Sequence, residues 1–443
     1  MTPLKTPKGW PSILLGRAGA YDPEGGLASA ERAGAWSAWQ QVAGRTAPEA
    51  LIRMVEEAGL RGRGGAGYPT AAKWRACRAA PGERHIVVAN GYEADPGAVM
   101  DRALMELDPH AVVEGTALAA YAVGAEEAYI AVRADASAAA DGLRAAIRVA
   151  EEAGYIGSDV TGRGSRVHVE VRPVPGGFLV GEETTLLRAL EGKRGMPEQR
   201  PPYPAVRGLH DQPTVVNNVA TLAAVPWIVS HGAAAFAAAG DPACPGSLLV
   251  QLSGAIKKPG LAEVPTGTRL GEIVQRVGGG ASGKLKAVLV GGPSGGFLPA
   301  AALDTPLSFG PIGAAGAIIG SGSLVVVDES ACIVELATTL ERFMNDESCG
   351  KCIPCRIGTK RLAEIGDRFV GGRPRPTDVQ LLADLSEDVR DGSLCGHGIT
   401  APNPLTSGMR YFEDEFQDHI VRGRCPAGVC TPLRVKAAAL TVS

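Results

Sequence analysis

The sequence is poor in aromatic residues and has no long hydrophobic run. Phe, Trp and Tyr make up 5% of its 443 residues. The longest uncharged apolar run near the start, PSILLG, is too short for the hydrophobic region of a signal peptide, and no stretch approaches a membrane span. We therefore expect a cytoplasmic protein with no direct membrane span.

An excess of basic residues is also missing. The chain has 44 Lys and Arg against 47 Asp and Glu, a formal net charge of −3, and no block of basic residues. Proteins that bind nucleic acid carry a basic patch that neutralises phosphates. Nucleic acid is therefore not an expected partner.

Cysteines are few, but several of them are closely spaced. Three of the nine lie between Cys349 and Cys355. In a reducing compartment this spacing indicates metal ligands rather than disulfides.

The chain is also longer than one hydrophobic core usually supports, which predicts two or three domains.

The stretch GLRGRGGAGYPTAAKW, residues 59–74, has the composition of a phosphate-binding loop. Five glycines in nine positions allow sharp turns and leave amide N–H groups free to face an anion, and Arg61, Arg63 and Lys73 add three cations. The preceding segment, 47–60, has the periodicity of an amphipathic helix that stops near Gly59. Neither the Rossmann nor the Walker fingerprint fits this order, and an ordinary surface loop remains the alternative.

Strands and helices alternate after this loop. Strands are expected at 85–90, 128–133 and 167–174, with helices over about 102–123 and 136–152. This order predicts a parallel sheet wrapped by helices, in which ligands bind beyond the carboxyl ends of the strands. Asn90 follows the first strand and is expected at that edge.

Three further segments carry polar residues in apolar surroundings. A helix is expected to begin near Gly181, with Glu182 and Glu183 in its first turn, where acids ordinarily complement the helix dipole. The proline-rich run 199–208 must be a loop. Residues 213–232 are expected to form a buried helix whose Asn217, Asn218 and Thr221 need polar partners.

The motif Cys349-x-x-Cys352-x-x-Cys355, with Cys395 further along, offers four thiolates. This arrangement suits a [4Fe–4S] cluster. Zinc also accepts four thiolates, but three cysteines at equal spacing favour iron over the paired motif of zinc ribbons. The cysteines fall between segments with helical patterns, which suggests a small bundle.

Four segments resemble, in order, the NADH-binding FMN and [4Fe–4S] flavoprotein subunit of respiratory complex I. They are the glycine-rich loop, GEETTLLRALEGKRGMPEQRPPYP, PTVVNNVATL and ESCGKCIPCRIG. The loop departs from the usual GLRGRGGAGFPTGxKW only at Tyr68 and Ala71. The resemblance extends equally to the diaphorase subunits of NAD-linked hydrogenases and formate dehydrogenases.

The resemblance implies an α/β fold with a Rossmann-like flavin domain and a parallel sheet, followed by a small β-grasp (SLBB-like) domain and a four-helix iron–sulfur bundle. The expected divisions are an N-terminal arm at 1–45, an FMN- and NADH-binding domain at 46–243, the β-grasp domain at 244–327, the [4Fe–4S] domain at 328–420 and a tail at 421–443.

The resemblance also implies the cofactor-binding residues. FMN carries the hydride, so no catalytic side chain is expected. Tyr68 and Tyr203 would stack on or line the path of the dinucleotide, Arg200 would meet its phosphate or ribose, and Glu182 and Glu183 would contact flavin and nicotinamide. The FMN- and NAD(H)-binding set is Gly62, Arg63, Gly64, Gly65, Tyr68, Lys73, Asn90, Tyr92, Glu93, Asp95, Gly181, Glu182, Glu183, Arg200, Tyr203, Asn217, Asn218 and Thr221.

One segment departs from the family pattern. Where the family usually has NADExEPG, this chain has NGYEADPG, with Gly91, Tyr92 and Asp95 replacing alanine, aspartate and glutamate. The carboxylate missing at position 92 normally hydrogen-bonds the flavin. The flavin potential, or the preference between NAD and NADP, is therefore expected to differ.

The expected function is that of a diaphorase subunit that exchanges hydride between NAD(H) and FMN and passes single electrons through the cluster. Its expected partners are a small thioredoxin-like [2Fe–2S] subunit and a larger iron–sulfur subunit of molybdenum-enzyme, hydrogenase or complex I type. The alternative is a non-enzymatic electron-transfer or scaffold subunit that keeps the cluster but has lost nicotinamide oxidation. The sequence does not indicate the direction of electron flow or the terminal partner.

The tail adds a possible second metal site. His419, Cys425 and Cys430 lie on one short segment that is expected to be exposed, and Cys332 is the best fourth ligand for a tetrahedral zinc. The CPAGVC sequence resembles the tail of the related subunit in electron-bifurcating hydrogenases. The alternative is that these residues bind no metal.

Overall fold

A computed structural model describes residues 2–23, 25–160 and 165–433, so the last part of the predicted tail, 434–443, lies outside the described residues. The chain divides into two compact units. The first contains Met1–Val250 and Leu261–Thr268, and the second contains Gln251–Gly260 and Arg269–Ser443. Across the described ranges, no helix combines the length and apolar character that crossing a membrane requires.

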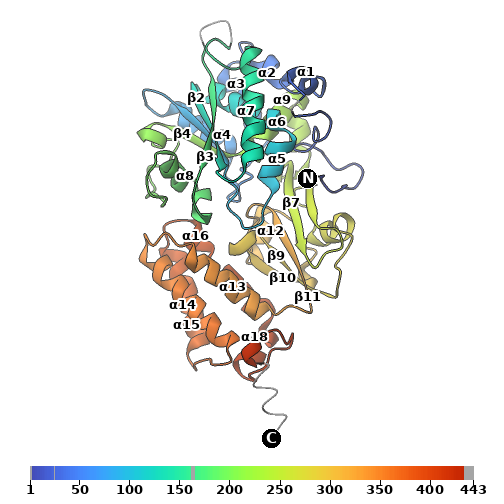
Figure 1. The fold of residues 1–443 in the computed structure, drawn as a ribbon, viewed down its shortest axis with the longest axis vertical. Helices are drawn as coiled ribbons and strands as arrows, with labels where there is room; N and C mark the ends of the chain where they lie inside the picture. The colour runs from blue at the N-terminus through green and yellow to red at the C-terminus, as the bar shows by residue number, and fades with distance from the viewer. Residues whose placement is uncertain (1, 24, 161–164, 434–443) are drawn as a thin grey trace. The chain divides into compact units, whose positions relative to one another are not determined.

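The first unit, which begins at the blue end of the chain in Figure 1, contains a four-stranded parallel sheet with the strand order β3-β2-β1-β4. Its strands are β1 Ile86–Gly91, β2 Glu127–Arg133, β3 His168–Val174 and β4 Thr214–Asn218. Because every pair is parallel, the carboxyl ends of the strands meet at one edge. The predicted α/β fold with a parallel sheet is confirmed.

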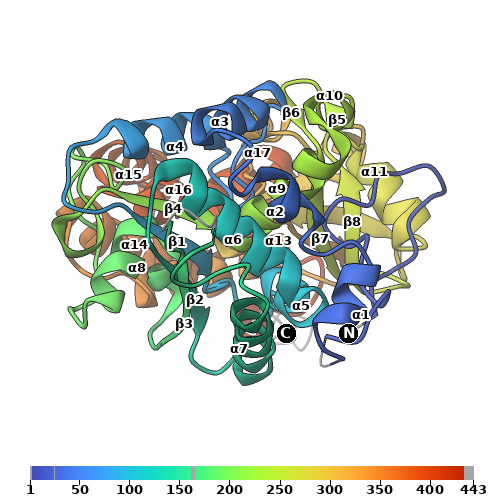
Figure 2. The ribbon, with the colours of Figure 1, turned by 90° about the horizontal axis from the view of Figure 1, so that it is seen from above.

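Helices cover both faces of this sheet because β1 is apolar on both sides. Val87 and Ala89 belong to the larger core with the helices α6 and α9, whereas Ile86 and Val88 belong to a smaller core with residues of α8. A strand buried on both faces reads as a continuous apolar run, as this one does. Figure 2 shows these helices around the strands. The helices of this unit are α1 Leu27–Arg32, α2 Ser37–Val42, α3 Pro48–Glu57, α4 Thr70–Ala79, α5 Met100–Leu107, α6 Pro109–Val123, α7 Ser137–Glu152, α8 Glu183–Leu190, α9 Val219–His231 and α10 Ala233–Ala237.

Two sequence-based boundaries were wrong. The helix expected over 102–123 is two helices, because Asp108 ends α5 and caps α6 by accepting a hydrogen bond from the backbone N–H of Ala111. The helix expected over 213–232 begins only at Val219, and the residues before it form β4. Asn217 therefore lies on a strand, and Asn218 is the N-cap of α9.

The packing of α6 against α9 depends on a glycine. A Cβ at Gly115 of α6 would lie 2.0 Å from the carbonyl oxygen of Leu222 in α9. No other residue fits at that distance, so Gly115 sets how closely the two helices approach.

The N-terminal arm is held to α6 by buried polar groups. The fully buried Glu114 carboxylate accepts hydrogen bonds from the backbone N–H groups of Trp36 (2.9 Å) and Trp39 (3.0 Å). His110 accepts a hydrogen bond from the indole N–H of Trp36 at 3.0 Å, and Arg17 donates to Asp108 at 2.9 Å. The predicted arm is therefore part of the first unit's packed structure.

The second unit combines a small sheet with a helical region. In the sheet, β9 Leu285–Val290 pairs antiparallel with β10 Gly296–Pro299 and with β11 Ser323–Asp328, and residues 251–254 pair parallel with β11. The strands β7 Ser247–Gly254 and β8 Gly260–Pro265 each contribute residues to both units, and β5 Gly240–Asp241 pairs with β6 Cys244–Pro245 in the first. The short helices α11 Leu270–Glu272 and α12 Phe309–Ala314 accompany this sheet.

The C-terminal region is helical, as predicted. Its elements are α13 Ile333–Asp346, α14 Ile353–Val370, α15 Asp378–Gly392, α16 Gly396–Thr400, α17 Asn403–Tyr411 and α18 Glu413–Ile420. Residues 405–420, which the sequence pattern predicts as a single helix, are divided at Phe412, whose φ of −127° and ψ of 40° end α17 before α18 begins. The short α16 was not predicted.

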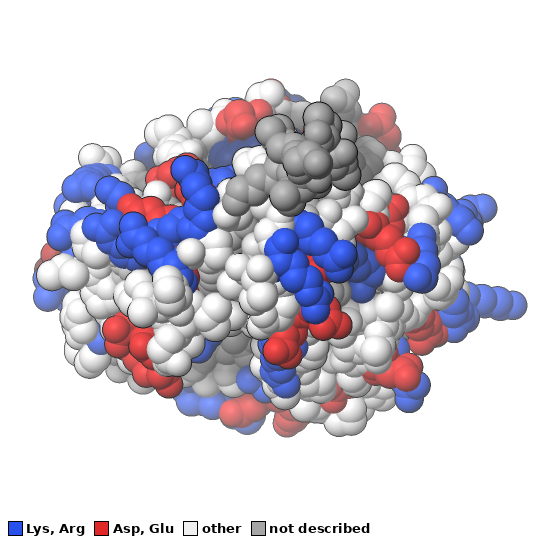
Figure 3. Space-filling model, turned by 90° about the horizontal axis from the view of Figure 1, so that it is seen from below, with Lys and Arg blue, Asp and Glu red and all other residues white. Residues whose placement is uncertain are grey.

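Acidic and basic side chains are mixed on the face seen in Figure 3. Among the ion pairs of the second unit, Arg368 contacts Asp378, and Arg422 and Arg424 both contact Asp418. These basic groups therefore have acidic neighbours.

Candidate functional site

The glycine-rich loop leaves the C-terminus of α3, as the sequence predicts, and returns to begin α4. The backbone N–H of Gly62 donates to the carbonyl oxygen of Tyr68 at 2.9 Å, which closes the loop on itself. Gly65 and Gly67 have φ of 105° and 63°, which side-chain-bearing residues rarely adopt. A Cβ at Gly64 would lie 3.1 Å from the Cβ of Asn218, so the glycine lets the loop lie against that residue.

The loop meets the carboxyl edge of the parallel sheet. The backbone N–H of Arg63 donates to the hydroxyl of Thr221 at 2.8 Å. The amide of Asn218 reaches the carbonyl oxygen of Asn90 at 3.4 Å, and the amide of Asn90 donates to the carbonyl oxygen of Gly181 at 3.0 Å. Motifs that are far apart in the sequence therefore converge at the edge where α/β folds bind ligands.

A charged group made of Lys73, Glu183 and Arg200 lies at the same site. Lys73 Nζ is 2.9 Å from one oxygen of Glu183, and Arg200 Nη1 is 2.9 Å from the other. All three side chains are 21–30% exposed, so the group is open to a ligand. Lys73 Nζ also donates to the carbonyl oxygen of Val216 at 2.9 Å, which fixes its position against β4.

The two neighbouring glutamates have different roles. Glu182 is the N-cap of α8 and accepts hydrogen bonds from the backbone N–H groups of Thr184 and Thr185. That is the ordinary use of an acid at a helix start. Glu183 makes no such cap and points to the cations.

Two large aromatic side chains are exposed, Tyr68 on the glycine-rich loop and Tyr203 next to Arg200. Tyr68 is 56% exposed and Tyr203 is 57% exposed, and the Arg200 guanidinium carbon lies 6.0 Å from the Tyr203 ring centroid. Exposed tyrosines of this kind offer flat faces on which an aromatic ring can stack.

Some predicted side chains do not face this space. The Arg63 guanidinium is buried and donates to the Cys244 sulfur at 3.1 Å and to the Pro245 carbonyl oxygen, so only its backbone N–H belongs to the loop contacts. Tyr92 is 1% exposed and packs in the core with Val174 and Val180. The side chain that replaces the family's aspartate is thus a packing residue.

Asp101 was missed by the sequence reasoning. It lies in the first turn of α5 and accepts a hydrogen bond from the amide of Asn218 at 2.5 Å. The sequence signal was an acid at a helix start, but the helix was expected to begin one residue after it, which left Asp101 outside every motif. Glu93, which was predicted, accepts hydrogen bonds from the backbone N–H groups of Asp101 and Arg102.

The four cysteines of the predicted cluster lie in one neighbourhood of the second unit. Cys352 is the N-cap of α14, Cys355 lies in its first turn, and Cys395 is the N-cap of α16. Cys355 and Cys395 are buried, whereas Cys349 and Cys352 are half-buried. Burial, and the neighbouring thiols of Cys352, Cys395 and Cys349, raise the pKa of the Cys355 thiol to about 12.

That electrostatic pattern fits a metal centre. Four thiolates cannot ionise together in one buried place unless a positive charge accompanies them, and a bound metal supplies that charge. His397 does not compete as a ligand at Nε2, which lies 2.8 Å from the carbonyl oxygen of Met344. A Cβ at Gly398 of α16 would lie 3.0 Å from the Cβ of Cys355, so α16 approaches α14 closely.

The structure also brings together the four residues of the possible second metal site. The potential ligand atoms of Cys332, His419, Cys425 and Cys430 all lie within 4.8 Å of one another. The expectation of an exposed site was wrong, because only Cys425 is half-buried and the other three are buried. The tail folds back, so that Cys430 packs in the same apolar core as Cys332.

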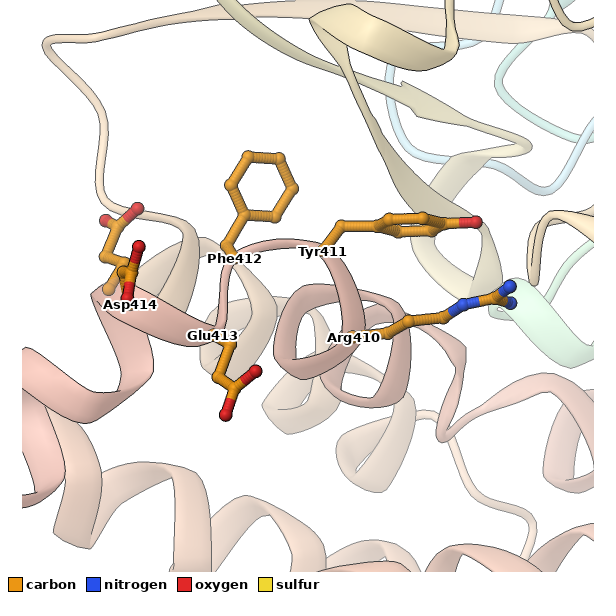
Figure 4. A pocket seen from close by; sticks show the side chains of 6 residues that line it. Arg410, Tyr411, Phe412, Glu413 and Asp414 are labelled. Carbon is orange, nitrogen blue, oxygen red and sulfur yellow. The ribbon is translucent and has the colours of Figure 1, made fainter.

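A pocket elsewhere in the second unit contains none of these residues. It has a volume of about 470 Å³ and is lined by residues 410–415 at the corner between α17 and α18 (Figure 4). Arg410 lies over the Tyr411 ring at 4.9 Å, and Glu415 forms an ion pair with Lys286 at 2.7 Å. Two charged side chains that line the pocket, Arg410 and Glu415, therefore already have partners. The pocket contains none of the binding residues that the motifs predict.

Two family profiles match the chain. The Nuo51 FMN-binding domain matches residues 55–227, and the NADH-ubiquinone oxidoreductase-F iron–sulfur binding region matches residues 335–419. The first range contains the glycine-rich loop and the sheet edge. The second contains the four cluster cysteines.

Individual relatives cover most of the chain. NADP-reducing hydrogenase subunit HndC of Solidesulfovibrio fructosivorans is 44% identical over 388 residues, which is 87% of this chain and 79% of the relative. An NADH-quinone oxidoreductase subunit of Rhizobium meliloti is 40% identical over 407 residues, which is 91% of this chain and 97% of the relative. The crystal structure of a NAD+-reducing [NiFe]-hydrogenase in the H2-reduced state matches with a TM-score of 0.80 and 35% identity, over 93% of this chain and 67% of that one.

The FMN-binding and [4Fe–4S]-binding regions are therefore present in the family's order, on a fold that the relatives share, and the residues at both sites suit those groups. The chain belongs to the family of FMN- and [4Fe–4S]-binding oxidoreductase subunits that NADH-quinone oxidoreductases and NAD(P)-linked hydrogenases, both multisubunit complexes, have in common.

Proposed function

We propose that this chain is a diaphorase subunit that exchanges hydride between NAD(H) and FMN and passes single electrons through the [4Fe–4S] cluster to or from partner subunits. The observation that carries the proposal is the convergence of the glycine-rich loop with the Lys73, Glu183 and Arg200 group at the carboxyl edge of the sheet. FMN, when bound, supplies the step between two-electron and one-electron chemistry.

Different residues at the sheet edge suit different parts of the two ligands. The backbone N–H groups of the glycine-rich loop suit a phosphate, because successive amides in turns with positive φ form an anion-binding concavity. Asn90, Asn217 and Asn218 present amides to the polar part of a flavin. The exposed rings of Tyr68 and Tyr203 suit the flat bases of a dinucleotide.

The Glu183 carboxylate lies between the two cations and pairs with both. It contacts Lys73 on one side and Arg200 on the other, which fixes both cations at the site. A phosphate or ribose of the dinucleotide would contact the same two cations. Glu183 also keeps this part of the site from being strongly positive, which favours NAD(H) over the more negative NADP(H).

Anaerobic addition of NADH, and separately of NADPH, to the purified FMN-loaded chain tests this function by flavin absorbance. NADH is expected to bleach the flavin. The rival function, an electron-transfer or scaffold subunit without nicotinamide oxidation, predicts an unchanged flavin with both nucleotides. A Lys73→Met variant should weaken flavin and dinucleotide binding, whereas Lys360→Met, an exposed lysine on α14, should leave the bleaching unchanged.

Partners are proposed at the level of subunit chemistry. Members of this family belong to complexes, and a chain with one flavin and one cluster needs a further redox centre to deliver or receive electrons. We propose a small [2Fe–2S] subunit and a larger iron–sulfur subunit of hydrogenase, molybdenum-enzyme or complex I type, in the cytoplasm. Purification of the complex from its source organism with a tag on this chain identifies them.

We propose in addition that Cys332, His419, Cys425 and Cys430 hold a structural metal ion, and that the metal is zinc. Three thiolates and one imidazole are a common tetrahedral zinc set. The four ligand atoms lie within 4.8 Å of one another, which is close enough for all of them to reach one ion.

The hydrogen bonds around the proposed ligands support this site. His419 Nδ1 lies 2.8 Å from the carbonyl oxygen of Glu415, which leaves Nε2 facing the sulfurs of Cys332 at 3.4 Å and Cys430 at 3.5 Å. Metal-binding histidines are usually oriented by such a bond from the other ring nitrogen. The Cys332 sulfur caps α13 by accepting a hydrogen bond from the backbone N–H of Glu335 at 3.4 Å, where the helix N-terminus favours a thiolate.

Metal analysis decides between zinc and unliganded thiols. About one zinc per chain is expected beside the cluster iron, and a Cys425→Ser/Cys430→Ser double variant should lose the zinc while it keeps the iron. Cys77→Ala, at a buried cysteine of the first unit, is the matched control and should keep both. A wild-type chain free of zinc after purification without chelators would remove the site.

A further inference from the structure

Two carboxylates lie together beside the glycine-rich loop. Glu93 follows β1, and Asp101 lies in the first turn of α5. One oxygen of Glu93 accepts a hydrogen bond from the backbone N–H of Asp101 at 2.8 Å, and the other accepts one from Arg102 at 2.9 Å. The Glu93 carboxylate is therefore seated on the N-terminus of α5.

The backbone of Glu93 is strained to reach this position. Its φ is 43°, one of few positive values among the non-glycine residues that the structure describes. Such conformations are energetically costly and occur often at functional sites. The strain turns the Glu93 side chain toward α5, where it meets Asp101.

Asp101 connects the pair to the binding loop. One of its oxygens lies 2.5 Å from the amide nitrogen of Asn218, whose Cβ lies 3.1 Å from the place that a Cβ of Gly64 would occupy. Both carboxylates are half-buried, so they are neither sealed in the core nor freely solvated.

The charges around the pair are unbalanced toward negative. Asp95 is the third acid, on the loop between β1 and α5. The cations are Arg102 on α5 and Arg133 at the end of β2, and Arg133 donates to the Glu93 carbonyl oxygen at 3.2 Å while it pairs with Asp135. Tyr92 also faces Arg133. No cation therefore neutralises Asp101 by direct contact within the described residues.

The two carboxyls consequently differ in protonation. Burial raises the pKa of Glu93, but the bonds from the N-terminus of α5 favour its charged form. Burial first, and then the charge of Glu93, raise the pKa of Asp101 well above the usual range. Two interacting acids titrate as a pair, and the proton resides mainly on Asp101.

We propose that Glu93 and Asp101 hold one proton between them at neutral pH and accept the proton that nicotinamide oxidation leaves at the flavin, then release it to water. The proposal rests on the proposed diaphorase function. NADH is oxidised to NAD+, two electrons and one proton. The two electrons leave one at a time through the cluster, the Glu93 carboxylate takes the proton by forming an O–H bond, and the pair then loses one proton to solvent.

The pair has the properties that this role requires. A carboxylate with a raised pKa is a competent base near neutrality, whereas an ordinary surface carboxylate is too weak. The proton already on Asp101 keeps the pair at a single negative charge, so Glu93 accepts a proton without a second ionised acid in contact with it. The half-buried position gives the proton a way out.

Infrared difference spectroscopy of the FMN-loaded chain tests the proposal, with stepwise chemical reduction of the flavin in place of NADH. We expect the native chain at neutral pH to show the carbonyl band of a protonated carboxyl, shifted in D2O and altered when the flavin is reduced. Asp101→Asn should lose this band. Asp135→Asn, which removes a neighbouring exposed carboxylate, should keep it.

A kinetic measurement separates proton transfer from a merely structural effect. Reoxidation of the reduced flavin should slow about 100-fold in Asp101→Asn, the low end of general acid–base effects, and should lose its pH dependence. Because the reductant is chemical, a flavin that NADH fails to bleach contradicts only the diaphorase function. A native chain with no carboxyl band that changes on flavin reduction, or an Asp101→Asn chain that keeps that band, overturns the proton-holding pair.

Discussion

Glu341 offers a sharp stability prediction because its carboxyl group is buried without compensation. It lies on α13 with no exposed surface, and neither of its oxygens has a hydrogen-bond partner among the described residues. Burial alone raises its pKa well above the usual range. The group is therefore expected to be a neutral acid in the folded chain.

Replacing the buried Glu341 carboxyl is expected to increase the free energy of unfolding. An unsatisfied buried polar group costs about 1–3 kcal/mol. Glu341→Met replaces it with an apolar side chain of similar volume and should recover about that much. For a unit of this size the increase corresponds to a melting temperature higher by about 2–4 °C per kcal/mol.

The pH dependence has a definite sign. A carboxyl whose folded pKa is raised binds more protons in the folded state than in the unfolded one, so stability falls as the pH rises from the unfolded pKa toward the folded pKa. Below the unfolded pKa the penalty is absent. Glu341→Gln keeps the unsatisfied polar group but cannot ionise, so it should remove the pH-dependent part only.

Thermal unfolding of the second unit, followed by loss of the cluster absorbance between pH 5 and 8, measures both effects. The Met variant should melt higher than the wild type at every pH, whereas the Gln variant should melt near the wild type at the low end of this range and increasingly above it as the pH rises. A Met variant less stable than the wild type would refute the reasoning, because Glu341 would then make a favourable interaction in the fold. Glu364→Gln, a partly exposed acid on α14, is the control and should change little.

Four other predictions follow from the described contacts. Cys395→Ser should abolish the iron absorbance while FMN stays bound, since the cysteines and the flavin residues belong to different units, and iron and flavin analysis checks it. Gly115→Ala should destabilise the first unit by about 3 kcal/mol or more, because its Cβ would lie 2.0 Å from the Leu222 carbonyl oxygen, and urea unfolding measures this. Burial lowers the pKa of His110 to about 4, so its contribution to stability should be present above pH 6.5 and lost as the pH falls toward 4, and His110→Gln should flatten that part of the profile. Thr221→Val, which removes the hydroxyl that accepts the Arg63 backbone N–H at 2.8 Å, should weaken FMN binding about tenfold in an equilibrium titration, whereas Thr400→Val in the second unit should not.

The sequence predicts the parallel sheet well because the signals are strong and local. The run from Ile86 to Ala89 is apolar, its first three residues are β-branched, and both faces of that strand are buried. The glycine-rich loop could likewise be predicted from the sequence, since several of its glycines adopt positive φ. The bounds of elements that depend on tertiary pairing could not be predicted from the sequence. Val215 and Val216 continue a helical pattern in the sequence, but pairing with β1 makes them a strand.

Side-chain direction was the least predictable feature. Arg63 sits in the glycine-rich loop, but its guanidinium turns to Cys244 and Pro245, residues that are remote in sequence. Asp101 joins the site through the bond from its backbone N–H to Glu93 and its contact with the amide of Asn218, and both partners lie outside its own helix. The grouping of Cys332 with His419 and the tail cysteines was predictable from ligand chemistry, whereas their burial was not.

The most direct test of the central claim is an anaerobic NADH titration of the FMN- and cluster-loaded chain, followed by flavin absorbance and by EPR of the reduced cluster. NADH is expected to bleach the flavin, and the signal of a reduced [4Fe–4S] cluster is expected to appear with the bleaching. In Cys395→Ser the flavin should still bleach without that signal. An unbleached flavin, or a bleached flavin in the wild type whose cluster remains oxidised while added dithionite reduces it, would contradict the claim that electrons pass from nicotinamide through this chain to the cluster.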